Sequence, residues 1–168
     1  VNAGDTSVRE VLDTKLQLVV VDVTINNIPH RIIGGHAPPT SDLRVKKEYY
    51  EKVARALQHI HTQDQRNPFA PAAKQRVVVW GQDRNMTRWE EDEERPQKKG
   101  GERRRDLERA VEIAEHEAGG EAGMIDTFRL LQGKARDYTH GKRRIDTISV
   151  AENVVDTKGT PRIIKCEH

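Results

Sequence analysis

Two strand-forming segments joined by a short asparagine turn constrain the fold of this chain more than any other feature. Residues 16–25 (LQLVVVDVTI) are rich in β-branched side chains, which favour strands. Asn26-Asn27 is a turn signal, and residues 30–35 (HRIIGG) form a second strand-like segment before a Pro-Pro pair, at which a ladder ends. The pattern predicts an antiparallel hairpin, and it argues against a purely parallel sheet.

The segment after the hairpin has the pattern of a long amphipathic helix. Thr40, Ser41 and Asp42 are three candidate N-caps in a row. Behind them, apolar residues recur at spacings of three and four, which predicts one buried stripe on a helix of about five turns, with Lys and Glu on the other face. The stripe consists of Val45, Tyr49, Val53, Ala56, Leu57 and Ile60. Residues 62–75 are then expected to form a polar loop.

The second half of the chain alternates between strand and helix patterns. A strand is predicted at residues 76–80 (RVVVW), in which Arg76 is followed by an uninterrupted apolar run that suits a strand buried on both faces. The dense charge run 88–106 predicts an exposed, mobile loop, and a second helix follows from Leu107 to Ala118. Residues 124–131 form a short apolar segment, and strands are predicted at 144–150 and 162–165. The fold class is therefore α/β or α+β with a mixed sheet.

Composition excludes some classes of protein and leaves others open. The net charge of +2 does not identify a nucleic-acid partner, although charged residues make up 33% of the chain. Cys166 is the only cysteine, so no internal disulfide forms. No apolar run approaches the roughly 20 residues that span a bilayer, and residues 1–9 lack a signal-peptide pattern, so we expect an intracellular, nuclear or cytoplasmic protein. The missing initiator methionine predicts an excerpt from a longer chain.

Polar reactive groups stand next to several predicted strands. In VVVWGQDRNM (77–86), Asp83 and Asn85 follow a buried strand, where a plain turn is one interpretation, since both residue types hydrogen-bond nearby backbone. His36 follows the second hairpin strand, Asp146 lies near the start of RIDTISV, and Glu167-His168 follow the last strand. Loops at strand ends often carry functional residues. Histidines, carboxylates and an amide in such places suit phosphoester hydrolysis, which needs an activated water and charge stabilisation.

The order of these motifs resembles a known family. GGHAPP, a long helix, VVVWGQDRN, MIDTFRLL, YTH, RRIDTISV and a terminal EH follow one another as in the second half of the endonuclease/exonuclease/phosphatase (DNase I-like) superfamily. Residues 82–85 stand for its GDFN-like motif, 143–147 for SRIDY and 166–168 for SDH. The sequences of these motifs are most similar to those of the retrotransposon and apurinic endonuclease branches. The resemblance covers about residues 11–168. It implies a partial DNase I-like β-sandwich with flanking helices.

The resemblance also implies roles for individual residues. Asp83 would polarise or deprotonate the attacking water, Asn85 would help to hold the phosphate, and His36 would touch the scissile phosphate. His168 would stabilise charge on the phosphate oxygens, with Asp146 orienting it.

A divalent ion and a nucleic-acid partner are implied in the same way. Magnesium or manganese would bind at Asp83 and at Glu167, which takes the place of the usual aspartate.

Departures from the family pattern qualify the expected function. Gln82 replaces a glycine, and Arg84 replaces an apolar residue, so its charge must reach solvent or a partner. The N-terminal half of the family, with its main metal-binding glutamate, has no counterpart here, so residues 1–168 are expected to form a single truncated domain. The leading prediction is metal-dependent phosphodiester hydrolysis of nucleic acid, with the activity impaired in this fragment. The alternatives are a phosphomonoesterase acting on inositol phosphates or lipids, and a non-catalytic remnant that binds nucleic acid or protein.

Overall fold

One mixed sheet with helices packed on it forms the body of the molecule. The computed structural model describes residues 9–13, 15–67, 76–86, 101–120, 123–132 and 146–151. Within these ranges the strand order is β1-β2-β3-β4-β6-β5, and the β3–β4 pair is parallel whereas the other pairs are antiparallel. The strands are β1 (Arg9–Asp13), β2 (Leu18–Ile25), β3 (Ile28–His36), β4 (Val77–Asp83), β5 (Met124–Asp126) and β6 (Asp146–Ala151). The helices are α1 (Leu43–Arg66), α2 (Glu102–Gly119) and α3 (Thr127–Gln132). The predicted mixed α/β class is confirmed.

The asparagine turn joins β2 and β3 into the predicted antiparallel hairpin. Asn26 and Asn27 have φ angles of 50° and 61°, the left-handed conformation that a tight hairpin turn requires and that asparagine tolerates. Strand β3 extends beyond the predicted 30–35 at both ends. It therefore includes His36 as its last residue, which places this side chain on the sheet instead of after it.

Helix α1 begins where the predicted caps stand. The Asp42 side chain accepts a hydrogen bond from the backbone N–H of Arg44 at 2.9 Å, the usual N-cap contact. Tyr49, Val53, Leu57 and Ile60 are buried as predicted. Two assignments on this helix are wrong: Val45 is 43% exposed, and the buried position beside it is Lys46, although lysine was expected on the outer face.

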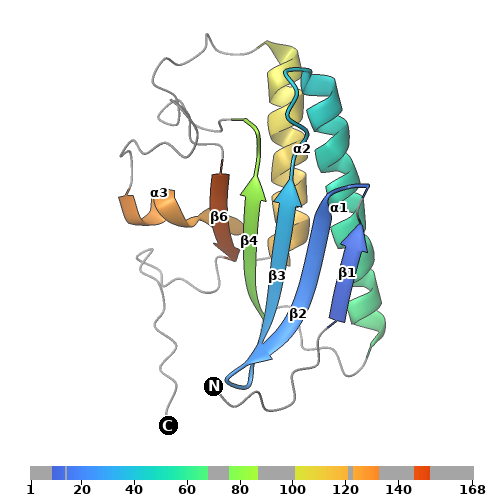
Figure 1. The fold of residues 1–168 in the computed structure, drawn as a ribbon, viewed down its shortest axis with the longest axis vertical. Helices are drawn as coiled ribbons and strands as arrows, with labels where there is room; N and C mark the ends of the chain where they lie inside the picture. Colours follow the sequence, from blue (N-terminus) through green and yellow to red (C-terminus); the bar gives the residue numbers. More distant parts are fainter. Residues whose placement is uncertain are drawn as a thin grey trace.

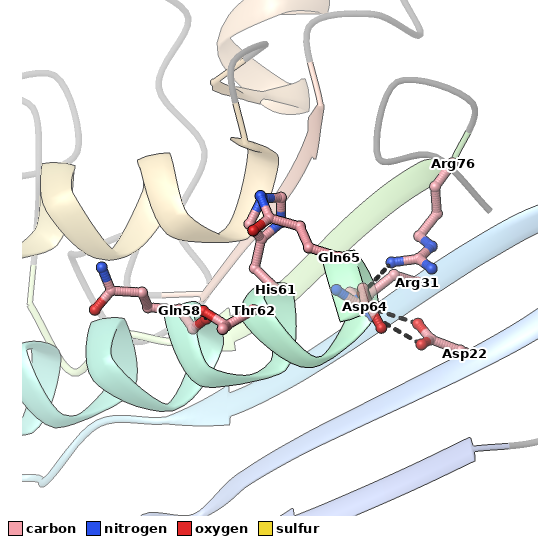
Figure 2. A network of polar contacts seen from close by, with 8 residues as sticks. All are labelled: Asp22, Arg31, Gln58, His61, Thr62, Asp64, Gln65 and Arg76. Carbon is pink, nitrogen blue, oxygen red and sulfur yellow. Dashed lines mark hydrogen bonds and ion pairs between the residues drawn. The ribbon is translucent and has the colours of Figure 1, made fainter. Parts of the chain in front are cut away.

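A buried ionic network explains why α1 continues through residues 62–66, which were predicted to be loop. Arg31 on β3 contacts both carboxylate oxygens of Asp22 and one of Asp64, each at 2.7 Å, and Arg76 contacts Asp64 at 2.8 Å (Figure 2). Burial by itself would raise the pKa of Asp64, but hydrogen bonds and charge from Arg76 and Arg31 outweigh it and hold this pKa below its ordinary value. The network ties the last turn of α1 to the sheet.

Helices α1 and α2 lie side by side along one face of the sheet (Figure 1). The side chains that β2, β3, β4 and β6 direct to this face, among them Val20, Ile33, Trp80 and Ser149, are almost fully buried. Residues that alternate to the opposite face are more open, with Ile148 58% exposed. Burial along β4 alternates too, so the prediction that this strand is buried on both faces is wrong.

Helix α2 begins earlier than the charge pattern indicated. Gly101 is its N-cap and Glu102 lies in its first turn, where a negative charge stabilises a helix. Arg104 pairs with Glu108 one turn later at 3.1 Å. The prediction of a loop is therefore wrong for residues 102–106, which are helical because arginine and glutamate are good helix formers. Residues 88–100 of the predicted loop lie outside the described residues. The helix ends at Gly119, before Gly120 at φ 64°.

Two further expectations concern the end of the chain and membranes. Strand β6 covers Asp146–Ala151, close to the predicted 144–150, whereas the predicted strand at 162–165 lies outside the described residues. No helix in the described part of the chain is long and apolar enough to cross a membrane.

Candidate active site

Three of the predicted site residues lie in one row across the sheet. His36 on β3 is the register partner of Asp83 on β4, and Asp83 is the register partner of Asp146 on β6. Register partners direct their side chains to the same face at about 5 Å spacing. Since Gln82 and Thr147, their neighbours along the strands, face the helices, this row points to the opposite face. The structure therefore brings together residues that are 47 and 63 positions apart along the chain.

Asn85 joins this row through a tight turn. Its φ angle is 49°, and its backbone N–H donates to Asp83 Oδ1 at 2.9 Å, so the plain turn interpretation describes the backbone correctly. The Asn85 Nδ2 group also donates to the Ala37 carbonyl at 2.7 Å and lies 3.3 Å from His36 Nε2. His36 Nε2 is 3.4 Å from Asp83 Oδ2. Three predicted residues thus contact one another.

The row is accessible to a ligand. The side chains of His36 and Asp83 are 46% and 32% exposed, and Asp146 is exposed as well. The carboxylate Oδ1 of Asp83 is held by the turn, whereas its Oδ2 faces His36. The arrangement therefore presents a partly exposed carboxylate, with one oxygen fixed by the turn and the other next to an imidazole nitrogen.

Gln17 also belongs to this site, although no sequence motif indicated it. Its side-chain Oε1 lies 2.7 Å from His36 Nδ1, and its carbonyl accepts the His36 backbone N–H at 3.2 Å. Gln17 precedes β2 and has a φ angle of 50°. It meets His36 only because the antiparallel pairing of β2 and β3 returns the end of β3 to the start of β2. No local motif encodes such a contact.

Two buried cationic side chains, Arg84 and Lys46, stabilise the turn that carries Asp83 and Asn85. Arg84 is fully buried, with Nη2 at 2.7 Å from Glu115 Oε1 on α2 and Nε at 2.9 Å from Thr147 Oγ1. The expectation that the Arg84 charge must reach solvent or a partner is confirmed, and the partner is Glu115. Lys46 on α1, 5% exposed, donates its ammonium to the backbone carbonyl of Asn85. Both helices are thereby connected to the turn that carries Asp83 and Asn85.

Gln82, the replacement for a glycine, does not disturb this turn. It is 6% exposed and lies within β4, which continues through it to Asp83. With its amide oxygen toward Arg84, it accepts from Nη2 at 3.0 Å. The substituted residue is therefore part of the buried support.

The donor atoms of the row are of the kind that a hard divalent cation takes. Mg²⁺ is commonly bound through one or two carboxylates together with water and phosphate oxygens, and Asp83 and Asp146 can supply two such groups. Across the ranges that the structure describes, no group of three or more histidine, cysteine, aspartate or glutamate residues is placed to hold a metal ion. Glu167 and His168, including the predicted pairing of His168 with Asp146, lie outside those ranges.

Comparisons with known proteins identify the fold. No protein-family model and no curated protein matches the sequence. Among solved structures, an AP endonuclease from Archaeoglobus fulgidus is similar at a TM-score of 0.55 and 17% identity, over 89% of this chain and 60% of that one. Humanised D. rerio TDP2 (TM-score 0.47, 17% identity, 86% and 50%) and the endonuclease domain of TRAS1, a telomere-specific non-LTR retrotransposon (0.41, 14%, 89% and 58%), are further matches.

This chain spans 50–60% of the length of these three structures. At 17% identity the likeness to the AP endonuclease concerns the fold. With its mixed sheet and its pair of packed helices, the chain has part of the DNase I-like fold, the fold that the order of its motifs predicts.

Proposed function

We propose that this chain takes part in the metal-dependent hydrolysis of phosphodiester bonds in nucleic acid. The observation that carries the proposal is the contact of His36, Asp83 and Asn85 where β3 and β4 end, with Asp146 in register beside them. The similarity of fold to an AP endonuclease supports the same class of substrate. Fold by itself does not fix function, so the proposal rests on the site.

Asp83 is placed to activate water. The Asn85 backbone N–H fixes Asp83 Oδ1, and the partly exposed carboxylate places Oδ2 beside His36 Nε2, where it would meet a water molecule. Attack of that water on phosphorus forms one P–O bond and breaks another, while Asp83 orients the water and takes its proton. The exposed leaving oxygen then receives a proton from solvent. The fixed turn keeps the carboxylate in one orientation, which lowers the entropic cost of the attack.

His36 and Asn85 are placed to bind phosphate oxygens. A His36 ring protonated at Nε2 would donate to a phosphate oxygen and stabilise the charge that develops there. The Asn85 amide would release its 3.3 Å contact with His36 Nε2 and donate to a phosphate oxygen in its place. It would keep the shorter hydrogen bond of 2.7 Å to the Ala37 carbonyl. Protonation of His36 removes its acceptor and so favours that exchange.

A divalent cation is part of the proposal. Magnesium or manganese would neutralise charge on the phosphate, held by Asp83 and Asp146 and, as the family resemblance implies, by Glu167. Because the main metal-binding glutamate of the family has no counterpart in this sequence, we expect these 168 residues alone to hydrolyse DNA very slowly or not at all.

A plasmid-nicking assay tests the proposal. It compares the 168 residues with the longest protein that the gene encodes, with magnesium and with chelator. We expect chelator-sensitive nicking by the longest protein, lost in Asp83→Ala and kept in Asp106→Ala, which removes an exposed carboxylate on α2. Nicking that survives Asp83→Ala would refute the proposed role of this residue.

Two other outcomes would identify the alternatives. Phosphate release from inositol phosphates or phosphoinositides without nicking would identify a phosphomonoesterase. Salt-dependent DNA binding without hydrolysis by any form of the protein would identify a binding module. Either outcome would overturn the proposed reaction.

A further inference from the structure

Gln17 adopts a backbone conformation that glutamine rarely takes. Its φ angle of 50° lies in the left-handed region, which costs a residue with a side chain on the order of 1 kcal/mol or more unless the surroundings compensate. Here the compensation comes from His36: its backbone N–H donates to the Gln17 carbonyl, and its Nδ1 lies 2.7 Å from Gln17 Oε1. The backbone carbonyl and the side-chain oxygen of Gln17 are therefore both directed at one residue.

The shortest contacts of the His36 ring favour one of its two neutral tautomers. The Ala37 carbonyl can only accept, so the Asn85 atom at 2.7 Å from it is the donating Nδ2. The other hydrogen of that group is available to His36 Nε2 at 3.3 Å. A neutral ring that accepts at Nε2 has its proton on Nδ1, and this is the nitrogen that faces Gln17 Oε1.

We propose that Gln17 is a positioning residue that holds neutral His36 in the Nδ1–H tautomer. This choice leaves the Nε2 lone pair on the side of Asp83 and Asn85, where it accepts from the Asn85 amide and would take up the proton with which His36 then donates to a phosphate oxygen. Without the Gln17 acceptor, the exposed ring would favour the Nε2–H form that imidazoles prefer in water, and it would present a hydrogen instead of a lone pair to Asn85. The catalytic consequence rests on the proposed function, whereas the tautomer assignment does not.

Nitrogen NMR of the histidine rings tests the tautomer directly. Long-range ¹H–¹⁵N spectra of the labelled 168-residue chain, at a mildly alkaline pH where ordinary imidazoles are neutral, separate protonated from unprotonated ring nitrogens. His36→Gln identifies the His36 signals by their loss. His30 provides an internal reference, because its Nδ1 lies 2.7 Å from the Ile28 carbonyl, which can only accept.

Two substitutions at position 17 separate side chain from backbone. Gln17→Gly removes the amide and suits the positive φ, so the turn is retained. Gln17→Glu keeps an acceptor of the same length. We expect protonated Nδ1 for His36 in the wild type and in Gln17→Glu, and a shift toward protonated Nε2 in Gln17→Gly, with His30 unchanged. Protonated Nε2 in the wild type, or no shift in Gln17→Gly, would overturn the proposal.

Nicking rates add the catalytic readout. In the longest active protein, Gln17→Gly should lower kcat on the order of tenfold, as the loss of a histidine-orienting partner does elsewhere, with a smaller effect on KM, and Gln17→Glu should retain most of kcat. If no form of the protein nicks DNA, the proposed function fails while the NMR result still decides the tautomer. A shifted tautomer with unchanged kcat would refute the positioning role.

Discussion

The buried Arg84–Glu115 pair allows a quantitative prediction about the support of the site. The two side chains are 0% and 7% exposed, and their charged atoms are 2.7 Å apart. Removing one partner of such a pair leaves the other charge buried without compensation, which costs about 3–5 kcal/mol. Glu115→Gln keeps the shape of the side chain and removes only its charge, so we expect it to lower the free energy of unfolding by roughly 3 kcal/mol.

A second variant separates the cost of an orphaned charge from the value of the pair. In Arg84→Met with Glu115→Leu, both charges are replaced by apolar groups of similar volume, an exchange that is often neutral or stabilising in protein interiors. We therefore expect the double variant to be more stable than Glu115→Gln. The amide of Gln82 and the hydroxyl of Thr147 then lose an arginine partner, so the recovery should be incomplete.

Urea denaturation followed by circular dichroism measures both effects, with the shift of the midpoint converted at constant m-value. The matched control is Glu108→Gln in the exposed Arg104–Glu108 pair of the same helix, whose side chains are 27% and 41% exposed; its expected effect is below about 0.5 kcal/mol. A loss of less than about 1 kcal/mol in Glu115→Gln, or a double variant no more stable than the single one, would refute the electrostatic argument.

Three further predictions concern other parts of the structure. Asp64→Asn should lower stability by roughly 3 kcal/mol at neutral pH. Because the folded-state pKa of Asp64 lies below its ordinary 3.8, the carboxylate stabilises the fold above that pH. The difference in stability between the wild type and Asp64→Asn should therefore narrow as the pH falls below 3.8. Melting curves recorded across this pH range measure the difference, and a constant difference would contradict the prediction. Lys46→Met should raise the hydrogen-exchange rate of the Asn85 amide, because the ammonium no longer holds this turn; unchanged protection would count against the contact. Gly34→Ala should cost about 1–3 kcal/mol, since its new methyl would lie 2.7 Å from a valine methyl on β2. Gly81 is the register partner of Gly34 and has open space for a methyl, so Gly81→Ala should be neutral; equal midpoints for the two variants would refute this.

Much of the secondary structure follows from neighbouring residues alone. The β-branched runs and the Asn26-Asn27 turn specify the hairpin, because the left-handed angles that the turn needs are tolerated by asparagine. Asp42 specifies the start of α1 through a bond to its own second neighbour. The Asp83–Asn85 turn is equally local. In each case, the residues that decide the conformation are within a few positions of one another.

Predictions failed where distant residues decide. The local pattern of residues 62–66 predicts a loop, but Arg31 and Arg76 hold Asp64 and so extend the helix. Lys46 appeared to belong on the solvent face, but the carbonyl of Asn85, 39 residues away, compensates its burial. Burial of a charge depends on its partner, and the partner cannot be identified from local pattern.

The candidate site shows the same division. The sequence alone determined which residue types stand at the ends of strands, and so it specified His36, Asp83, Asn85 and Asp146. Only the tertiary structure decided that β3, β4 and β6 pair in the register that sets three of them in one row, and that Gln17 contacts His36. Register is fixed by burial of a whole sheet face against α1 and α2, because a slip of one residue would turn every side chain to the other face. That energy belongs to contacts between distant segments, which is why no single motif contains it.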